Sequence, residues 1–217
     1  NSHIMQGEVT SSLLGPFVGF HHQALLISAL WPEGMGNIGH GANVGSNHTG
    51  RLPDQEIRPG LGTFFGLGSN IKYPADYSDA PWSLIATGIT TLPQKVEFPF
   101  SLITQASHYN SSKLQSLNQI LPAWMLGNCA FTLARNEWKF NSRNKARRQD
   151  FSYTMLNKRT AQLVLKAYQR LNNIKEIKEF YTVAEIPGLG KNFITESVRQ
   201  KAQGFYKEYL ERFALNH

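Results

Sequence analysis

The strongest structural signal in this chain is the run LLGPFVGFHHQALLISALWPEGMGNIGHGANV, residues 13–44. An apolar residue recurs in it every six positions, with one miss at Pro32; the series is Leu14, Phe20, Leu26, Ile38 and Val44. The residues four positions later are mostly small or apolar. This pattern is typical of a parallel β-helix, in which a hexad is one short strand plus a turn and three hexads close an 18-residue triangular coil. The alternative is an ordinary β-sandwich with coincidental spacing.

Two asparagines and two loop-like segments add detail to this prediction. Asn37 and Asn43 each precede an apolar member of the series, where we expect corner residues in the left-handed conformation. Weaker hexads resume near Phe65. Segments 50–62 and 73–82 have the composition of loops and are predicted to be insertions.

The composition changes near residue 100, which predicts a structural boundary. The first hundred residues carry four Lys/Arg and seven Asp/Glu (net −3), and the remaining 117 carry eighteen and eight (net +10), summing to +7. Fourteen of the eighteen glycines lie in the first part. We therefore predict a left-handed β-helix with loop insertions over 6–105 and an α-helical region over 106–217. Residues 1–5, NSHIM, are interpreted as a cloning remnant, the alternative being a native start at Met5.

Other features narrow the class of protein. The longest apolar runs are shorter than the eighteen residues that a membrane-spanning helix needs. Cys129 is the only cysteine, which excludes an intramolecular disulfide framework and a zinc site made of thiolates. The N-terminus lacks the basic-then-apolar pattern of a signal peptide, so a cytoplasmic location is expected.

Three runs carry a resemblance to a known family. They are GPFVGFHHQALLISALWPEGMGNIGHGANVGSNHTGRLPDQEI, FFGLGSNIKYPADYSDAPWSLIATGITTLPQ and PAWMLGNCAFTLARNEWKF, and GANVGSNHTGR is the most specific block. Over residues 7–145 the chain resembles a bacterial family of unknown function often labelled UDP-N-acetylglucosamine pyrophosphorylase-related. The resemblance implies a left-handed parallel β-helix of the hexapeptide-repeat type found in acyltransferases. Its members are longer, so we expect a fragment; without a glycine-rich nucleotidyl-transfer signature, pyrophosphorylase activity is not expected.

The histidines of the first part allow three interpretations. In hexapeptide acyltransferases a histidine commonly acts as the general base, and imidazole suits this role because it exchanges a proton near neutral pH. His48 is the first candidate, with Asn47 as the orienting group or oxyanion donor, and His22 is the second. Alternatively, His22, His40 and His48 hold zinc, since His22 and His40 are one 18-residue coil apart. In the third interpretation they are corner residues that satisfy turn carbonyls.

A basic segment, RNEWKFNSRNKARR, covers residues 135–148 and has six Lys/Arg against one acid, Glu137. Such a cluster can bind the phosphates of a nucleotide, a coenzyme or RNA, or it can be a solvated helix face or pair with acids of a neighbouring subunit. Because no recognised nucleic-acid module surrounds it, nucleic acid is the least favoured ligand. The candidate phosphate-binding residues are Arg51, Arg143 and Arg147.

Helical spacing dominates the last hundred residues. One helix is predicted from Pro122, with an apolar stripe that reaches Trp138, and others over 150–172 and 192–215. The stripes are interpreted as packing faces. We expect these helices to cover the end of the β-helix, where backbone groups would otherwise be unpaired.

Together these observations predict an acyltransferase-like, sugar-nucleotide-related protein. Acyl-coenzyme A is the expected thioester donor, with no tightly bound cofactor, and a sugar amine or hydroxyl is the acceptor. We expect a homotrimer, because hexapeptide enzymes have sites between prisms and flat faces favour such packing; neither a membrane nor nucleic acid is expected as partner. The alternatives are a non-catalytic scaffold or binding module and a zinc-dependent lyase on the same fold.

Overall fold

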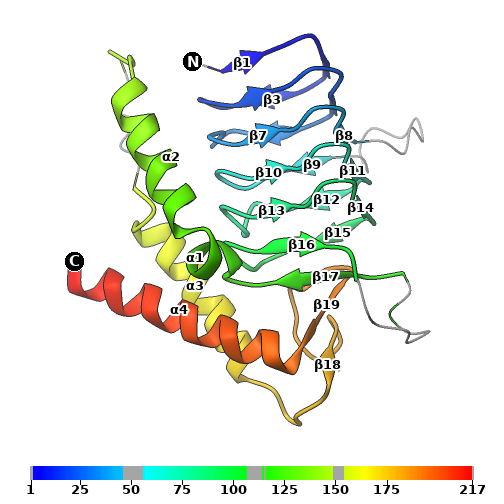
Figure 1. Ribbon diagram of the computed structural model, residues 1–217, viewed down its shortest axis with the longest axis vertical. Helices are drawn as coiled ribbons and strands as arrows, with labels where there is room; N and C mark the ends of the chain where they lie inside the picture. Colours follow the sequence, from blue (N-terminus) through cyan, green and yellow to red (C-terminus); the bar gives the residue numbers. More distant parts are fainter. Residues whose placement is uncertain (1, 46–55, 107–113, 115, 149–153, 217) are drawn as a thin grey trace.

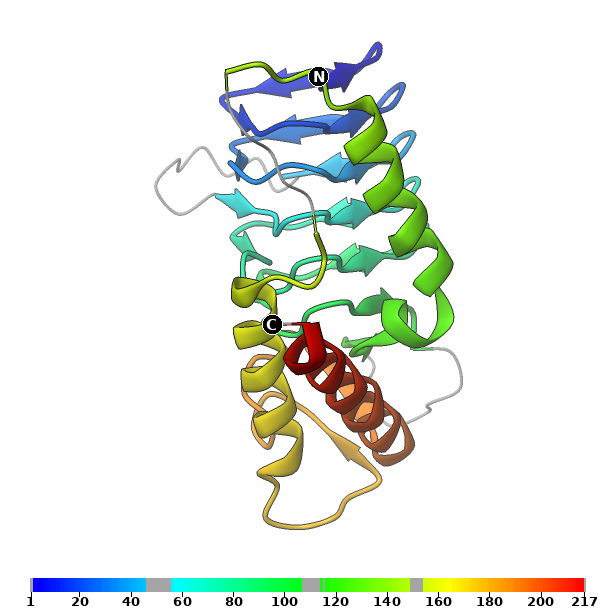
Figure 2. The same cartoon turned by 90° about the vertical axis from the view of Figure 1, so that its left-hand side faces the viewer.

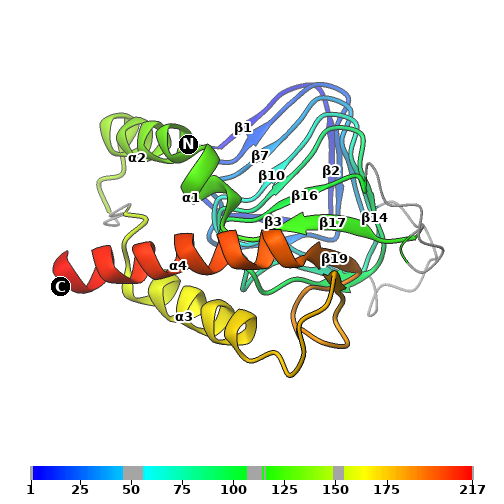
Figure 3. The same ribbon diagram turned by 60° about the horizontal axis from the view of Figure 1, so that its bottom comes forward.

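The chain winds as a parallel β-solenoid of about five turns, followed by a helical region (Figure 1). The computed structural model describes residues 2–45, 56–106, 114, 116–148 and 154–216. Seen nearly end-on, the coils form a three-sided prism (Figure 3). The predicted fold class, a parallel β-helix plus α, is therefore confirmed. The two-sheet sandwich is excluded for this region, because the solenoid strands pair in parallel from one coil to the next.

Each side of the prism is a stack of short strands. The nine-stranded sheet begins with β1 (His3–Ile4), β4 (Gly19–Phe20), β7 (Asn37–Ile38), β10 (Phe64–Phe65), β13 (Leu84–Ile85) and β16 (Leu102–Thr104). The five-stranded sheet contains β2 (Glu8–Thr10), β5 (Leu25–Ile27), β8 (Asn43–Val44), β11 (Asn70–Ile71) and β14 (Thr90–Thr91). The third side consists of β3 (Leu13–Leu14) and β6 (Leu30–Trp31), then β9 (Ile57–Arg58), β12 (Ala75–Asp76) and β15 (Gln94–Lys95).

Inward residues of successive coils form the core. Phe20 pairs with Ile38, eighteen positions later, and both are at most 1% exposed. On the third side Leu14 pairs with Trp31, seventeen positions later, and Trp31 is fully buried with its indole N–H donating to the carbonyl of Gly60 (2.9 Å). This one-residue shortening explains the miss at Pro32: the inward position on that side belongs to Trp31. Neither predicted insertion is a loop throughout, since 50–62 contains strand β9 and 73–82 contains strand β12, and these two strands pair in the third side of the prism.

The left-handed residues lie at the corners, but they are not the predicted asparagines. Asn37 and Asn43 are strand residues of β7 and β8. One corner is instead turned by a stack of residues with positive φ: Phe17, Met35, Gly62, Trp82 and Phe100. The next corner is turned by Gln23, Gly41, Gly68 and Gly88. The asparagine prediction was wrong because the chain turns two residues before each strand on this side rather than inside it.

Two helices cover the C-terminal end of the solenoid, as expected, but the backbone of the last coil pairs with a strand, β17 (Asn118–Leu121), in the region predicted to be α-helical. β17 pairs antiparallel with β16, and β19 (Asn192–Thr195) and β18 (Phe180–Tyr181) extend the same sheet. α4 (Glu196–Asn216) lies across this end, with the hydroxyl of the buried Tyr206 donating to the carbonyl of Pro99 at 2.6 Å (Figure 1). α3 (Lys158–Asn172) packs beside α4.

The helix boundaries differ from the expectations for local reasons. The first helix is divided into α1 (Trp124–Asn128) and α2 (Ala130–Arg143). α3 begins eight residues later than predicted, where the side chain of Asn157 accepts a hydrogen bond from the backbone N–H of Thr160 at 2.9 Å. The third helix begins late because 192–195 form a buried strand.

A buried ion pair joins α4 to its neighbours. Arg199 is 7% exposed and binds both carboxylate oxygens of Glu196, at 2.7 and 2.6 Å, while it also donates to the carbonyl of Leu171 at 2.7 Å. The hydroxyl of Tyr181 donates to Glu196 at 2.6 Å. The hydrogen bonds from Arg199, with that of Tyr181, lower the pKa of Glu196 from 4.5 to about 2.

Replacing Glu196 with Gln tests this ion pair through pH. Because the folded-state pKa is depressed, the stabilisation by Glu196 is present above pH 4.5 and is lost as the pH falls toward 2. We expect Glu196→Gln to lower the free energy of unfolding by about 2 kcal/mol at pH 7. The difference from wild type should shrink between pH 4.5 and 2, as measured by urea denaturation. A difference that is constant over this range would contradict the assignment.

The corner at Gln23 gives a second prediction. Gln23 is exposed with φ 59° and stacks above the corner glycines Gly41 and Gly68. Gln23→Gly should raise the free energy of unfolding by about 0.5 kcal/mol, because the left-handed strain that it removes, about 1–2 kcal/mol, exceeds the extra unfolded-state entropy of glycine, about 0.5–1 kcal/mol. Gln23→Val should lower it by about 1 kcal/mol. As a control, Gln162→Gly on the exposed side of α3 should be destabilising by about 0.5–1 kcal/mol. Equal effects at both glutamines would refute the corner assignment.

Candidate functional site

A long groove separates α2 from the outer face of the nine-stranded sheet. α2 runs along the prism, crossing successive coils of this sheet (Figure 2). The groove has a volume of about 1080 Å³ and is lined from both sides by polar, basic and apolar residues. Ser2, His3 and Met5 line one end, and they belong to the segment interpreted as a cloning remnant; the other lining residues come from the solenoid coils, Met125 and the segment 132–145.

The floor of the groove is built from one residue per coil. The first residue of each two-residue strand points outward, because its neighbour is the inward core residue. In register along the nine-stranded sheet these outward residues are Gly19, Asn37, Phe64 and Leu84, and all four line the groove. The floor thus changes from polar at the first coils to aromatic and aliphatic at the later ones.

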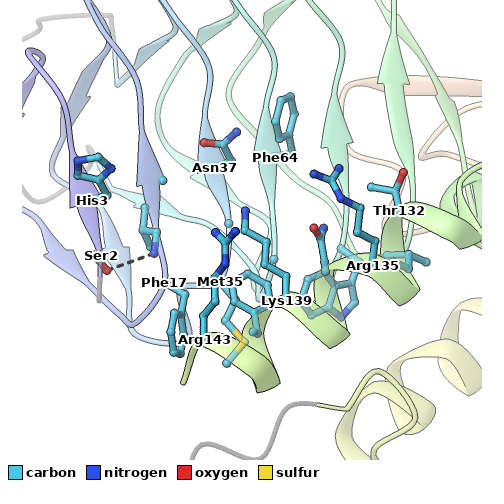
Figure 4. Close-up of a pocket in the computed structure, with 18 of the residues that line it drawn as sticks. Ser2, His3, Phe17, Met35, Asn37, Phe64, Thr132, Arg135, Lys139 and Arg143 are labelled. Atoms are coloured by element: carbon cyan, nitrogen blue, oxygen red, sulfur yellow. Dashed lines mark hydrogen bonds between the residues drawn. The ribbon is translucent and has the colours of Figure 1, made fainter. Parts of the chain in front are cut away.

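Basic side chains of α2 form the opposite wall. Arg135, Lys139 and Arg143 recur every four residues, which places them on one side of the helix, and all three line the groove. They extend from α2 toward the row that carries Asn37 and Phe64 (Figure 4). Within the part of the chain that the structure describes, no acidic residue lines the groove, and no ion pair neutralises these three cations. The groove is therefore a positively charged channel suited to an elongated anion.

Two apolar contacts seat α2 on the sheet. Leu133 is 2% exposed, and the ring of Phe140 lies 5.3 Å from that of Phe17, centroid to centroid. Phe131 and Trp138, on the opposite side of the helix, are 79% and 69% exposed. The prediction that Trp138 belongs to the packing stripe was therefore wrong, because Leu133 and Phe140 fill that role.

The structure describes two of the three histidines singled out in the sequence, His22 and His40. His48, Asn47 and Arg51 lie outside the described residues, so their roles stay predictions. His22 and His40 do meet at one corner of adjacent coils, where the N–H of Gly41 donates to the carbonyl of His22 at 3.1 Å. Neither lines the groove.

His21 is the histidine that sequence reasoning missed. It lines the groove one position before His22. Its signal was available: His21 directly follows the inward Phe20, which places it on the same side of the prism as the strand that forms the floor. The same logic, applied to the residue before each inward position, would have found Asn37 and Phe64.

Of the predicted arginines of the basic segment, the groove uses one. Arg143 lines it, and Arg147 is exposed and does not. Arg135 and Lys139 were not among the predicted phosphate-binding residues. The sequence shows that segment 135–148 is basic, but not which of its side chains face the sheet.

The zinc alternative includes His48, which lies outside the described residues, so it stays a prediction. Nδ1 of His22 is 3.1 Å from the side-chain oxygen of Gln6. Across the described ranges no group of three or more His, Cys, Asp or Glu side chains is placed to hold a metal ion. Nor is any helix in those ranges both long and apolar enough to span a bilayer.

Comparison with known proteins gives no match: no family model, no curated protein and no solved structure matches this chain. The fold that the sequence resemblance implies, a parallel β-helix, is the one observed. The family label itself stays a prediction.

The seating of α2 can be tested at Phe140. We expect Phe140→Ala to weaken the contact with Phe17 and to speed amide hydrogen exchange in the second half of α2, while the exchange of solenoid core amides such as that of Ile38 is unchanged. Phe131→Ala, on the exposed side, is the matched control and should leave exchange in α2 unchanged. If both variants behave alike, the Phe17–Phe140 contact does not hold the helix.

Proposed function

We propose that this protein is an acyltransferase-like hexapeptide-repeat protein that binds a phosphate-bearing ligand, a sugar nucleotide or an acyl-coenzyme A, in the groove beneath α2. The observation that carries the proposal is the row of Arg135, Lys139 and Arg143 along the groove, without a counterion among the described residues. Phosphate groups would supply the missing negative charge, and charge-assisted hydrogen bonds to them are strong.

The chemistry we propose is transfer of an acyl group from a thioester to a sugar amine or hydroxyl. The nucleophile attacks the thioester carbonyl carbon, and a base takes its proton. The carbon–sulfur bond then breaks, and the proton passes to the departing thiolate, which leaves as a free thiol. Of the described residues outside the first five, His21 is the groove-lining imidazole and hence a candidate base; His48, with Asn47 as its orienting group, is the other.

Binding measurements separate the two predicted arginines. Calorimetric titration with coenzyme A and with UDP-N-acetylglucosamine at low salt should show binding of at least one of them. Arg143→Gln should weaken it about tenfold through loss of a charge-assisted contact, whereas Arg147→Gln should change it less than about twofold. Equal losses in both variants, or no binding of either ligand by wild type, would refute the groove as the phosphate site.

Activity is tested by release of free thiol from acetyl-coenzyme A in the presence of a UDP-sugar with a free amine. We expect His21→Asn to abolish release if His21 is the base, and His48→Ala to abolish it if His48 is. Ligand binding without thiol release in wild type would leave the protein as a binding module. The second candidate is thus a non-catalytic scaffold or binding module, and Trp138, 69% exposed on the outer side of α2, is a residue able to serve its assembly into the proposed homotrimer.

A further inference from the structure

The aromatic ring of Phe64 narrows the chemical class of the ligand further than the positive charge of the groove does. Phe64 places a benzene ring on the groove floor, in register with Asn37 on one side and Leu84 on the other. A flat, electron-poor ring can stack on an aromatic side chain that lies beside positive charges, as Phe64 does on the groove floor. Stacking of a nucleobase on such a ring contributes substantially to binding.

The spacing of the other groups fits the rest of a nucleotide. Strands are about 4.8 Å apart, so Asn37 lies one strand from Phe64 and Gly19 lies two strands, or about 10 Å, away. In Figure 4 the amide nitrogen of Asn37 is on the side that faces Phe64. The cations from Arg135 to Arg143 extend over eight helical residues, about 12 Å. Along the groove, the Phe64 ring is therefore followed in one direction first by the polar donor Asn37 and then by the positively charged side chains of α2.

We propose, on the basis of the proposed function above, that the groove binds a nucleoside diphosphate unit. The base stacks on Phe64 with Arg135 beside it, the amide of Asn37 donates to the base edge or to the ribose, and the two phosphates lie between Lys139 and Arg143. Gly19 has no side chain, and the amide oxygen of Asn37 lies 2.8 Å from the place where its Cβ would be, so the Asn37 amide covers this part of the floor. Both sources of this unit, a sugar nucleotide and coenzyme A, share the chemistry.

The test compares ligands with and without a base. UDP, ADP and inorganic pyrophosphate are titrated into the full chain by calorimetry, and we expect the better nucleotide to bind at least about tenfold more tightly than pyrophosphate. Phe64→Leu, which keeps an apolar side chain but removes the stacking face, should reduce nucleotide affinity about tenfold and leave pyrophosphate affinity unchanged. Arg143→Gln should reduce both. Coenzyme A and UDP-N-acetylglucosamine are then titrated into the same variants, and the source of the unit is the one that loses affinity in Phe64→Leu.

Two controls protect the result against a folding defect. Phe131→Leu makes the same chemical change at an exposed position on the far side of α2 and should leave all affinities unchanged. Phe64→Tyr keeps the aromatic face and should keep nucleotide affinity within about twofold. If pyrophosphate binds as tightly as the nucleotides, or if Phe64→Leu behaves like Phe131→Leu while Arg143→Gln weakens binding, the nucleoside assignment is overturned and the phosphate groove stands. If none of the five ligands binds, the proposed function fails as well.

Discussion

Backbone hydrogen bonding between parallel coils is the constraint on which this structure depends. Each short strand has only two or three residues, too few to be stable alone, so every coil needs the coil before it and the coil after it. The inward column of Phe20, Ile38, Phe65, Ile85 and Ile103 is buried only because these strands keep register. At the C-terminal end that register meets β17, whose antiparallel pairing and cover by α4 stop the repeat. The Glu196–Arg199 pair then joins α4 to α3 and β18.

The repeat was readable from the sequence because it comes from a local rule: one apolar residue per six positions. The rule failed at Trp31, which is buried and follows its partner Leu14 by seventeen residues rather than eighteen. The first corner could not be predicted from residue type, since Phe17, Met35 and Trp82 adopt the left-handed conformation that sequence rules reserve for glycine and asparagine, whereas Gly41, Gly68 and Gly88 at the next corner follow those rules. Contacts between stacked coils compensate for the cost of the left-handed conformation at these residues. This compensation cannot be predicted from the preference of a single residue type.

The candidate site was predicted only in part, for a physical reason. Charge in the segment 135–148 is a composition property and was visible, but which cations face the sheet depends on how α2 is rotated. That rotation is fixed by the burial of Leu133 and by the contact of Phe140 with Phe17, which is more than a hundred residues earlier in the chain. The floor residues were not predicted because they occupy ordinary outward positions of the repeat, which carry no distinctive sequence signal. They line a groove only because α2 lies above them.

The order of the floor has a consequence for how such a site can diversify. Each coil contributes a single outward residue to the row Gly19, Asn37, Phe64, Leu84, while its inward neighbour maintains the prism. The ligand selectivity of the groove can therefore change by substitution of one floor residue at a time, without a change in the buried residues of the prism. A lineage could exchange one ligand for another by a few independent substitutions, and intermediate forms would remain folded.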